Sequence, residues 1–486
     1  MSQERGGAID LVSLAPLFNP ASVAVIGASR DAAKIGGLPI AFMKASGFAG
    51  ALYPVNPGGN EVQGLRAYRT VNEIPGPIDL AIVAVPAPAV LPALRECREK
   101  RVRAAVVFSA GFAEVGESGR TLQAEISDLA RAGGMRLVGP NCMGVMNFHT
   151  GLVANFHPAF KDGIGKAGRI GLVSQSGALS GLCFAMAADR GLAYSASAST
   201  GNEADVDAAD CLAYLAEDPA TSVIQLYLEG CRNGCKLMVA LDLARRRRKP
   251  VICLKPGSTA EGAAAVASHT AALAGSDAVF DAVLKQMGAY RAHSLEEFFD
   301  IAAACAVGVL PKNDRVGLVT VSGGIGVLMA DTAVRAGLEV PAIPETAQEK
   351  IRTLVSFAAT RNPVDITGHA VNVPTLTDKA LAIVIEDGGC GSVVLSIGAG
   401  GRNPVRAPQL IETCAALRQR FPETLLCLSC LHTADFRQKL AAIGCLCVEE
   451  PVHAVRAVAA LASFRRAFVQ TPTVPAVSAA APLPVG

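Results

Sequence analysis

Short apolar runs rich in β-branched residues alternate along almost the whole chain with amphipathic segments of helical length. A strand pattern that alternates with a helix pattern is typical of βαβ units, in which helices cover both faces of a parallel sheet. The alternation therefore predicts an α/β fold. The expected strands are Ser22–Ile26, Asp79–Val85, Ala104–Phe108, Arg169–Val173, Ser222–Leu228, Pro250–Leu254, Arg315–Val321 and Ser392–Ser396.

Three of these strands end in a turn of small residues that runs directly into a helical segment. The turns are Val25–Ser29, Leu172–Gly177 and Thr320–Gly324. Each has the form of the first βα unit of a doubly wound domain, so the chain is predicted to hold three such domains in series. We expect them at residues 1–148, 149–305 and 306–469. Residues 470–486 are rich in Pro, Ala and Val without helical period and are predicted to be a disordered tail.

Charge and hydropathy narrow the classes of partner. The 44 basic and 42 acidic side chains nearly cancel, which argues against nucleic acid and anionic membrane as partners. No apolar run approaches the roughly 20 residues that cross a bilayer, and the N-terminal residues lack a signal-peptide core, so we expect a cytoplasmic protein. Cys427 and Cys430 form an isolated C-x-x-C among fourteen scattered cysteines, and we predict no metal site.

The turn after the first strand suits a phosphate group. Gly27, Ala28 and Ser29 can present backbone N–H groups at a helix N-terminus, and Arg30 and Lys34 add positive charge. The turn lacks a full G-x-G-x-x-G, and the second strand ends in Tyr53–Pro57 without an acidic residue to hold a ribose. A conventional dinucleotide-dependent dehydrogenase is therefore disfavoured, whereas a phosphate-rich ligand such as CoA fits. The alternative is that the glycine only lets the helix pack on the strand.

The corresponding turn of the second domain, Ser174–Ala178, offers hydroxyls and free N–H groups without side-chain bulk, which suits a phosphoryl group. A small helix cap is the alternative. His269 stands further on within a run of small residues, where an imidazole could carry a phosphoryl group. Glu229, at the end of the strand Ser222–Leu228, could accept its second ring N–H. The alternatives are a surface or core histidine and a solvated carboxylate.

Taken together, the motifs resemble the α subunits of NDP-forming acyl-CoA synthetases, relatives of succinyl-CoA synthetase. They keep the family order and cover about residues 15 to 465. The matching segments are Leu17–Ser29, Gly139–Gly144, Ser174–Ala178, Gly201–Asp207, Tyr227–Gly230, Ser268–Thr270, Ala274–Asp277 and Asn362–Asp365.

The resemblance implies a Rossmann-like CoA-binding domain followed by two flavodoxin-like domains, with His269 as the phosphorylated histidine and Glu229 as its stabilising partner. It also implies two groups of binding residues. The phosphate site would comprise Ser174, Gln175, Ser176 and Gly177, and the CoA site Gly27, Ala28, Ser29, Arg30, Lys34, Asn56, Pro86 and Asn141.

The activity implied by the resemblance is synthesis of acyl-CoA from a small carboxylic acid, CoA and ATP, with release of ADP and phosphate through acyl phosphate and phosphohistidine intermediates. The sequence contains no ATP-grasp domain, so we expect an ATP-grasp β subunit to supply the ATP/ADP and Mg²⁺ site within a hetero-oligomer. Ala271 stands where the family usually has Gly. The alternative is thus a CoA-binding regulatory or scaffold protein that has lost catalysis.

Overall fold

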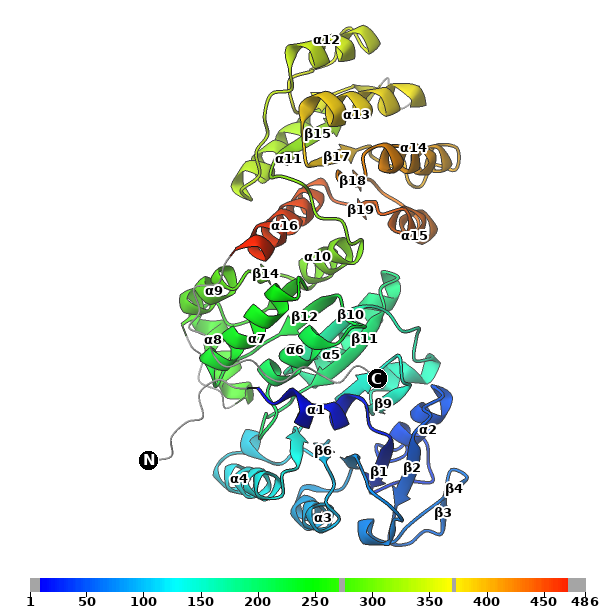
Figure 1. Ribbon diagram of the computed structural model, residues 1–486, viewed down its shortest axis with the longest axis vertical. Helices are drawn as coiled ribbons and strands as arrows, with labels where there is room; N and C mark the ends of the chain where they lie inside the picture. The colour runs from blue at the N-terminus through cyan, green and yellow to red at the C-terminus, as the bar shows by residue number, and fades with distance from the viewer. Residues whose placement is uncertain (1–8, 271–275, 369–372, 471–486) are drawn as a thin grey trace. The chain divides into compact units, whose positions relative to one another are not determined.

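The computed structural model describes residues 9–270, 276–368 and 373–470, with side chains at all of these positions except 162, 267–270 and 374. The chain forms two compact units (Figure 1). The first unit reaches His293, and the second begins at Ser294. Helices flank parallel sheets in both units, which confirms the predicted α/β class. Ala271 and the segment 471–486 lie outside the described residues.

The first unit opens with a five-stranded parallel sheet in the order β2-β1-β5-β6-β7. Its interior strand β1 is buried along its whole length and pairs with a neighbour on each side, with Val23 opposite Leu52 and Leu80. The strands are β1 (Ser22–Ile26), β2 (Ala51–Val55), β5 (Leu80–Val83), β6 (Ala104–Val107) and β7 (Arg136–Val138). The helices are α1 (Leu11–Phe18), α2 (Leu38–Ala45), α3 (Ala87–Glu99) and α4 (Glu117–Ala132), and a small hairpin joins β3 (Glu61–Val62) to β4 (Leu65–Arg66).

The second sheet of this unit has the order β14-β13-β12-β10-β11-β8-β9. Five strands are parallel, and the antiparallel hairpin β8–β9 extends the sheet beside β11. Residues 144–147 therefore already belong to the second sheet. The strands are β8 (Gly144–Asn147), β9 (Leu152–Asn155), β10 (Ile170–Ser174), β11 (Tyr194–Ser199), β12 (Val223–Tyr227), β13 (Val251–Leu254) and β14 (Tyr290–Ala292). The helices are α5 (Gly177–Asp189), α6 (Ala208–Glu217), α7 (Gly234–Arg246), α8 (Ala260–Thr270) and α9 (Asp277–Gln286).

The second unit contains a third parallel sheet, β16-β15-β17-β18-β19. Its strands are β15 (Val316–Thr320), β16 (Val364–Asp365), β17 (Ser392–Ser396), β18 (Leu425–Ser429) and β19 (Leu446–Val448). Its helices are α10 (Leu295–Ala306), α11 (Gly323–Arg335), α12 (Glu345–Leu354), α13 (Pro374–Gly388), α14 (Arg406–Arg420), α15 (Ala434–Ala442) and α16 (Pro451–Val469).

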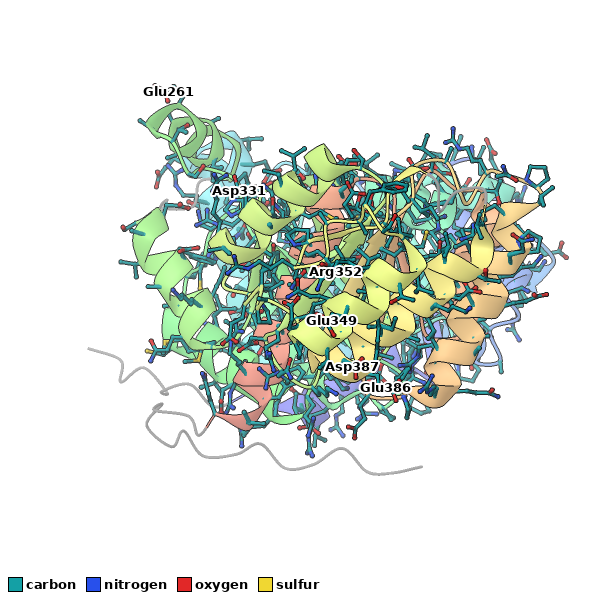
Figure 2. The ribbon with its side chains drawn as sticks, turned by 90° about the horizontal axis from the view of Figure 1, so that it is seen from above. Glu261, Asp331, Glu349, Arg352, Glu386 and Asp387 are labelled. Atoms are coloured by element: carbon teal, nitrogen blue, oxygen red, sulfur yellow. The ribbon has the colours of Figure 1, made fainter. Side chains whose placement is uncertain are left out.

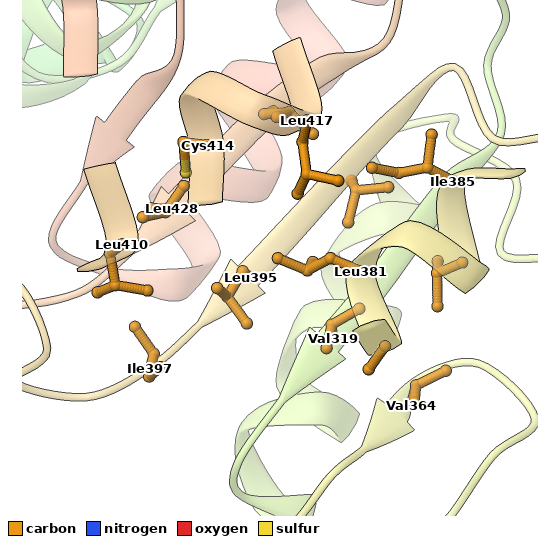
Figure 3. Close-up of a cluster of buried hydrophobic side chains, with 14 of the residues drawn as sticks. Val319, Val364, Leu381, Ile385, Leu395, Ile397, Leu410, Cys414, Leu417 and Leu428 are labelled. Atoms are coloured by element: carbon orange, nitrogen blue, oxygen red, sulfur yellow. The ribbon is translucent and has the colours of Figure 1, made fainter. Parts of the chain in front are cut away.

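One face of this third sheet packs on amphipathic helices. Leu395 and Leu428 from the strands meet Leu381 of α13 and Leu417 of α14 in a buried cluster (Figure 3). Charged side chains such as Glu349 of α12 lie at the surface of the same unit (Figure 2). Burial of the apolar faces is the main stabilising contribution here.

The three sheets share one topology. Numbered from its own first strand, the parallel part of each sheet has the order 2-1-3-4-5, the doubly wound order of flavodoxin-like folds. The prediction of three doubly wound domains in series is thus confirmed. In this topology ligands bind at the carboxyl ends of the strands, where the strand order reverses. Twelve of the fourteen cysteines are buried, including Cys427 and Cys430. Among the described residues, no helix is long and apolar enough to cross a membrane.

Candidate functional site

A cavity of about 260 Å³ lies in the first unit, where the carboxyl ends of strands from its two large sheets come together. Residues that follow β6 and β7 of the first sheet form one part of its wall. Residues that follow β10, β11 and β12 of the second sheet form the other part. The lining residues are Phe108, Asn141, Cys142, Met143, Phe156, Gln175, Ser176, Gly177, Ala178, Gly201, Asn202, Glu203, Glu229, Gly230 and Arg232.

The first turn of α5 forms one edge of the cavity. Ser176 is the N-cap, and its hydroxyl accepts a hydrogen bond from the Leu179 N–H (3.3 Å). Ser174 lies beneath the turn, where its buried hydroxyl donates to the Ser176 carbonyl (2.7 Å). Gly177 is required by a close approach, because a Cβ there would lie 2.6 Å from Cγ of Met143. The N–H groups at the start of a helix have no intrahelical acceptor and favour an anion.

Gln175 connects this turn to the end of β12. Its Oε1 accepts hydrogen bonds from the backbone N–H groups of Glu229 (2.5 Å) and Gly230 (3.0 Å). Its Nε2 donates to the Gly230 carbonyl (2.9 Å). The Glu229 carboxyl, only 6% exposed, accepts from the Tyr227 hydroxyl (3.3 Å). These bonds fix the backbone that presents Glu229 to the cavity.

Glu203 and Arg232 also line the cavity, although the sequence analysis did not single them out. Glu203 is 7% exposed, and burial, followed by the nearby Asp207, raises the pKa of its carboxyl to about 7. Arg232 donates from Nη1 to the Glu203 carbonyl (3.1 Å) and from Nη2 to the Asn202 carbonyl (2.9 Å). Among the described residues that line the cavity, it is the only one with a cationic side chain.

A chain of polar contacts joins the two sheets beside the cavity. The Asn202 amide donates to Glu114 Oε2 (2.5 Å), and the Asn141 amide donates to Asn202 Oδ1 (3.3 Å). Glu114 also accepts from the Gly111 N–H (2.6 Å). Burial tends to raise the pKa of Glu114, but these hydrogen bonds outweigh it and lower the pKa below its ordinary value. The loop after β6 is therefore held against the loop after β11.

The remaining wall is apolar. The rings of Phe108 and Phe156 pack against each other in a tilted arrangement with centroids 4.7 Å apart, and Cys142 and Met143 continue this surface. The cavity thus combines an anion-favouring helix N-terminus, two buried carboxyl groups, one guanidinium and an apolar side. Such a set of groups can hold a small anion next to an apolar fragment, with fixed hydrogen-bond geometry.

A separate group of predicted residues lies at the carboxyl edge of the first sheet. Gly27 has a φ of +83°, and a Cβ there would lie 2.5 Å from the Ala84 carbonyl oxygen, so only glycine fits. Asn56 Nδ2 donates to the Ala28 carbonyl (2.7 Å) and thereby holds the turn after β1. Arg30 and Lys34 are exposed. This edge is open, as an extended phosphate-bearing ligand would need.

The structure therefore divides the sequence-predicted residues into two groups. Gln175, Ser176, Gly177, Glu229 and Asn141 line the cavity, and Ser174 supports it from below. Gly27, Ala28, Ser29, Arg30, Lys34, Asn56 and Pro86 are absent from the cavity lining and belong to the first-sheet edge. His269 falls near the end of α8, and its side chain lies outside the described residues.

Family models match residues of each of the three sheets, the third sheet only in part. A CoA binding domain matches residues 21–148, a succinyl-CoA ligase-like flavodoxin domain matches residues 167–305, and a Ligase-CoA domain matches residues 316–405. The class defined by this fold is thus that of the CoA ligases related to succinyl-CoA ligase.

Individual relatives give a finer assignment. The α subunit of acetate–CoA ligase (ADP-forming) II from Pyrococcus furiosus is 40% identical over 356 residues, 73% of this chain and 76% of the relative. The 4-hydroxybutyrate–CoA ligase (ADP-forming) of Nitrosopumilus maritimus is 35% identical over 85% of this chain, which spans 58% of that longer relative. The chain belongs to the family of ADP-forming acyl-CoA ligases.

A solved structure agrees with this assignment. The acetyl-coenzyme A synthetase 1 of Ca. Korarchaeum cryptofilum, described as dinucleotide forming and determined in complex with phosphate and ADP, is similar with a TM-score of 0.84. It is 31% identical, and the match covers 94% of this chain and 97% of that one. The predicted family is confirmed, and none of these comparisons supports the catalytically inactive alternative.

Proposed function

We propose that this chain is the CoA-binding, phosphohistidine-carrying α subunit of an ADP-forming acyl-CoA ligase that acts on a small carboxylic acid. The observation that carries this proposal is the convergence of Gln175, Ser176, Gly177 and Glu229 on one cavity at the carboxyl ends of two sheets. The domain limits 1–148, 149–305 and 306–469 stay predictions; β8 (Gly144–Asn147) already pairs within the second sheet, and the second compact unit begins at Ser294.

In the proposed reaction His269 carries a phosphoryl group. Its N–P bond breaks as the phosphoryl group passes to the carboxylate of the acid, which becomes an acyl phosphate. The CoA thiol then loses its proton and its sulfur attacks the acyl carbon, so that phosphate leaves with the C–O bond electrons. Each step moves an anionic group, and the helix N-terminus of α5 favours such a group by its free N–H donors and its dipole.

Glu229 would orient the histidine. A buried carboxyl that accepts the second ring N–H fixes the tautomer of an imidazole and leaves the other nitrogen as the nucleophile. The hydrogen bonds from the Glu229 and Gly230 N–H groups to Gln175 support this role, because they hold the carboxyl-bearing residue in place.

CoA would lie along the open edge of the first sheet. Gly27, Ala28 and Ser29 would approach its phosphates by their backbone, and Arg30 and Lys34 would add charge. Asn56, Pro86 and Asn141 complete the proposed CoA-binding set. The apolar side of the cavity would receive the thiol end and the acyl group.

An ATP-grasp β subunit would bind ATP or ADP with Mg²⁺ and exchange the phosphoryl group with His269 in a hetero-oligomer. This chain spans 58% of the length of the 4-hydroxybutyrate–CoA ligase relative. The exclusion of nucleic acid and membranes as partners, and a cytoplasmic location, stay predictions.

The test is labelling of His269. The purified chain is incubated with an ATP-grasp subunit, Mg²⁺ and γ-³²P-labelled ATP, and acid-labile, alkali-stable label is counted. We expect label on the wild type and on the exposed control His149→Asn, and none on His269→Asn. Isothermal titration with CoA runs in parallel. A chain that binds CoA but takes no label beside an active partner would instead be a CoA-binding regulatory protein.

A further inference from the structure

Asn202 lines the cavity, but its side-chain amide is engaged by protein groups. Its Nδ2 donates to Glu114 Oε2 (2.5 Å) and to Gln123 Oε1 (3.0 Å), and its Oδ1 accepts from the Asn141 amide (3.3 Å). Both N–H groups of the amide and one of its acceptor positions are therefore occupied. A cavity residue bound in this way is suited to holding the wall in place.

The backbone of Asn202 is held as well. Its N–H donates to the Pro140 carbonyl (2.9 Å), and its carbonyl accepts from Arg232 Nη2 (2.9 Å). Pro140 follows β7 of the first sheet, whereas Arg232 follows β12 of the second sheet. Asn202 thus has a fixed place between the two sheets, from which its side chain reaches Glu114.

Glu114 is the partner of Asn202 on the loop after β6. It lies in the 3₁₀ turn η2 (Ala113–Val115), and its Oε1 accepts from the N–H groups of Gly111 (2.6 Å) and Phe112 (3.2 Å). One carboxylate oxygen therefore closes the loop on itself, and the other joins the loop to Asn202.

The order of the strands places this loop between the first-sheet edge and the cavity. In the order β2-β1-β5-β6-β7, the ends of β5 and β6 separate the turn after β1 from β7. The residues of this part that line the cavity are Phe108, directly after β6, and Asn141 to Met143, after β7. A ligand that occupies both the turn after β1 and the cavity must therefore cross the loop after β6.

We propose that Glu114 and Asn202 are a pair of positioning residues for the pantetheine arm of CoA. The hydrogen bond between them holds the loop after β6 against the cavity wall, so that the arm crosses a fixed surface and its thiol reaches the acyl phosphate. This inference rests on the proposed function and adds two residues to it. Neither residue takes part in the chemistry itself.

A purely structural role, in which the pair only joins the two sheets, is the competing explanation. Other contacts already make this connection. The Ala204 N–H donates to the Gly139 carbonyl (2.9 Å), and Arg136 Nε donates to Asp205 Oδ2 (2.9 Å). The connection between the sheets therefore does not depend on the pair, whose hydrogen bond acts on the loop after β6.

The test compares two ligands by isothermal titration. CoA carries the pantetheine arm, whereas 3′-phospho-ADP is the nucleotide portion of CoA alone. Glu114→Gln keeps an oxygen for the N–H groups of Gly111 and Phe112 but presents an NH₂ group to the Asn202 amide, so it breaks only the link. Glu117→Gln, at an exposed position at the start of α4, is the matched control.

We expect the wild type to bind CoA more tightly than 3′-phospho-ADP. In Glu114→Gln the affinity for CoA should fall about 10-fold, because the arm loses its fixed surface. The affinity for 3′-phospho-ADP and the labelling of His269 by ATP should stay as in the wild type, because neither involves the arm. Glu117→Gln should match the wild type in all three measurements.

An exchange of donor and acceptor tests the link itself. Asn202→Asp places two carboxylates face to face and should also weaken CoA binding. Combined with Glu114→Gln, it offers a carboxylate to the new amide and restores a hydrogen bond, so the double variant should bind CoA more tightly than either single variant. Thermal unfolding checks each protein, and the double variant decides the question if a single variant does not fold.

The two ways in which the inference can fail are distinguishable. It is overturned, with the proposed function intact, if the wild type binds both ligands equally, if Glu114→Gln binds CoA as the wild type does or loses affinity for both ligands alike, or if the double variant recovers nothing. A wild type that binds no CoA, or takes no label beside an active ATP-grasp subunit, removes the proposed function and this inference together.

Discussion

The turn after β1 and the turn after β10 occupy equivalent places in two sheets of the same topology, yet they are built differently. In each, a glutamine side chain makes hydrogen bonds that help to hold the turn. Gln63 Nε2 donates to the carbonyls of Ser29 (3.1 Å) and Gly37 (3.0 Å) in the first turn. Gln175 connects the second turn to the end of β12. The two turns thus share the topology of their sheets and a glutamine side chain that forms hydrogen bonds to backbone groups.

Their surroundings differ in charge and exposure. The first turn carries the exposed cations Arg30 and Lys34, whereas the second lies beside the buried carboxyl groups of Glu203 and Glu229. Exposed cations suit a long anionic ligand that lies on the surface and exchanges with solvent. Buried, hydrogen-bonded groups suit a short-lived reacting group that needs fixed geometry. In the proposed function, one topology would thus serve CoA binding at one edge and phosphoryl transfer at the other.

Replacing Gln175 with alanine should have the largest effect on this comparison. The change leaves the N–H groups of Glu229 and Gly230 without their acceptor, which costs about 1–3 kcal/mol for each buried group. We expect the labelling rate of His269 to fall about 100-fold, or about 3 kcal/mol in barrier height. Quantitative ³²P labelling at pH 8 measures it. If Gln175→Ala instead lost CoA affinity, the turn after β10 would contribute to CoA binding, and the two turns would not have separate roles.

Gln63→Ala is the matched variant for the first turn. It removes two hydrogen bonds that shape the turn, so CoA affinity should fall about 30-fold, at about 1 kcal/mol for each bond. Isothermal titration gives the affinity, and labelling of His269 by ATP should stay at the wild-type rate. A variant that binds CoA as the wild type does would contradict the assignment of this edge to CoA.

Arg232→Ala should have the smallest effect of the three. The guanidinium is exposed at the cavity and its contacts are to backbone carbonyls, so its contribution to holding phosphate is about 1 kcal/mol. We expect the phosphate concentration for half-maximal rate, measured from acyl-CoA, ADP and phosphate, to rise about 5-fold. Arg131→Ala on α4 is the control and should leave it unchanged. An unchanged value in Arg232→Ala would restrict the anion site to the N-terminus of α5.

The sequence predicted the class of fold and most strands that begin a βα unit. The runs Ser22–Ile26 and Ser392–Ser396 coincide with β1 and β17, because a buried parallel strand is apolar along its whole length. Strands with less apolar sequence were not predicted. β11, Tyr194–Ser199, contains three serines and is nevertheless fully buried, since its hydroxyls find partners such as Thr221 (2.7 Å from Ser195).

The candidate site was predicted only in part, because some of its residues stand in a recognisable local pattern and others do not. Ser176, Gly177 and Glu229 could be chosen because small residues after a strand and a carboxylate at a strand end are visible in one segment. Glu203 lies within the motif Gly201–Asp207, but no local pattern distinguishes it from a solvated carboxylate. Glu203 and Gln175 line the same cavity although they lie 28 positions apart in the chain.

The sequence alone thus determined the alternation of strands and helices, the small-residue turns and the family motifs, because each depends on neighbours along the chain. Tertiary structure decided which turns share a cavity, which carboxyls are buried, and which glutamine holds which backbone. The physical reason is that the burial of a side chain and its hydrogen-bond partners depend on segments that are distant in the sequence and meet only in the folded chain. The pKa of Glu203, about 7 because of its burial and Asp207, exists only once β11, α6 and the start of α5 have packed together.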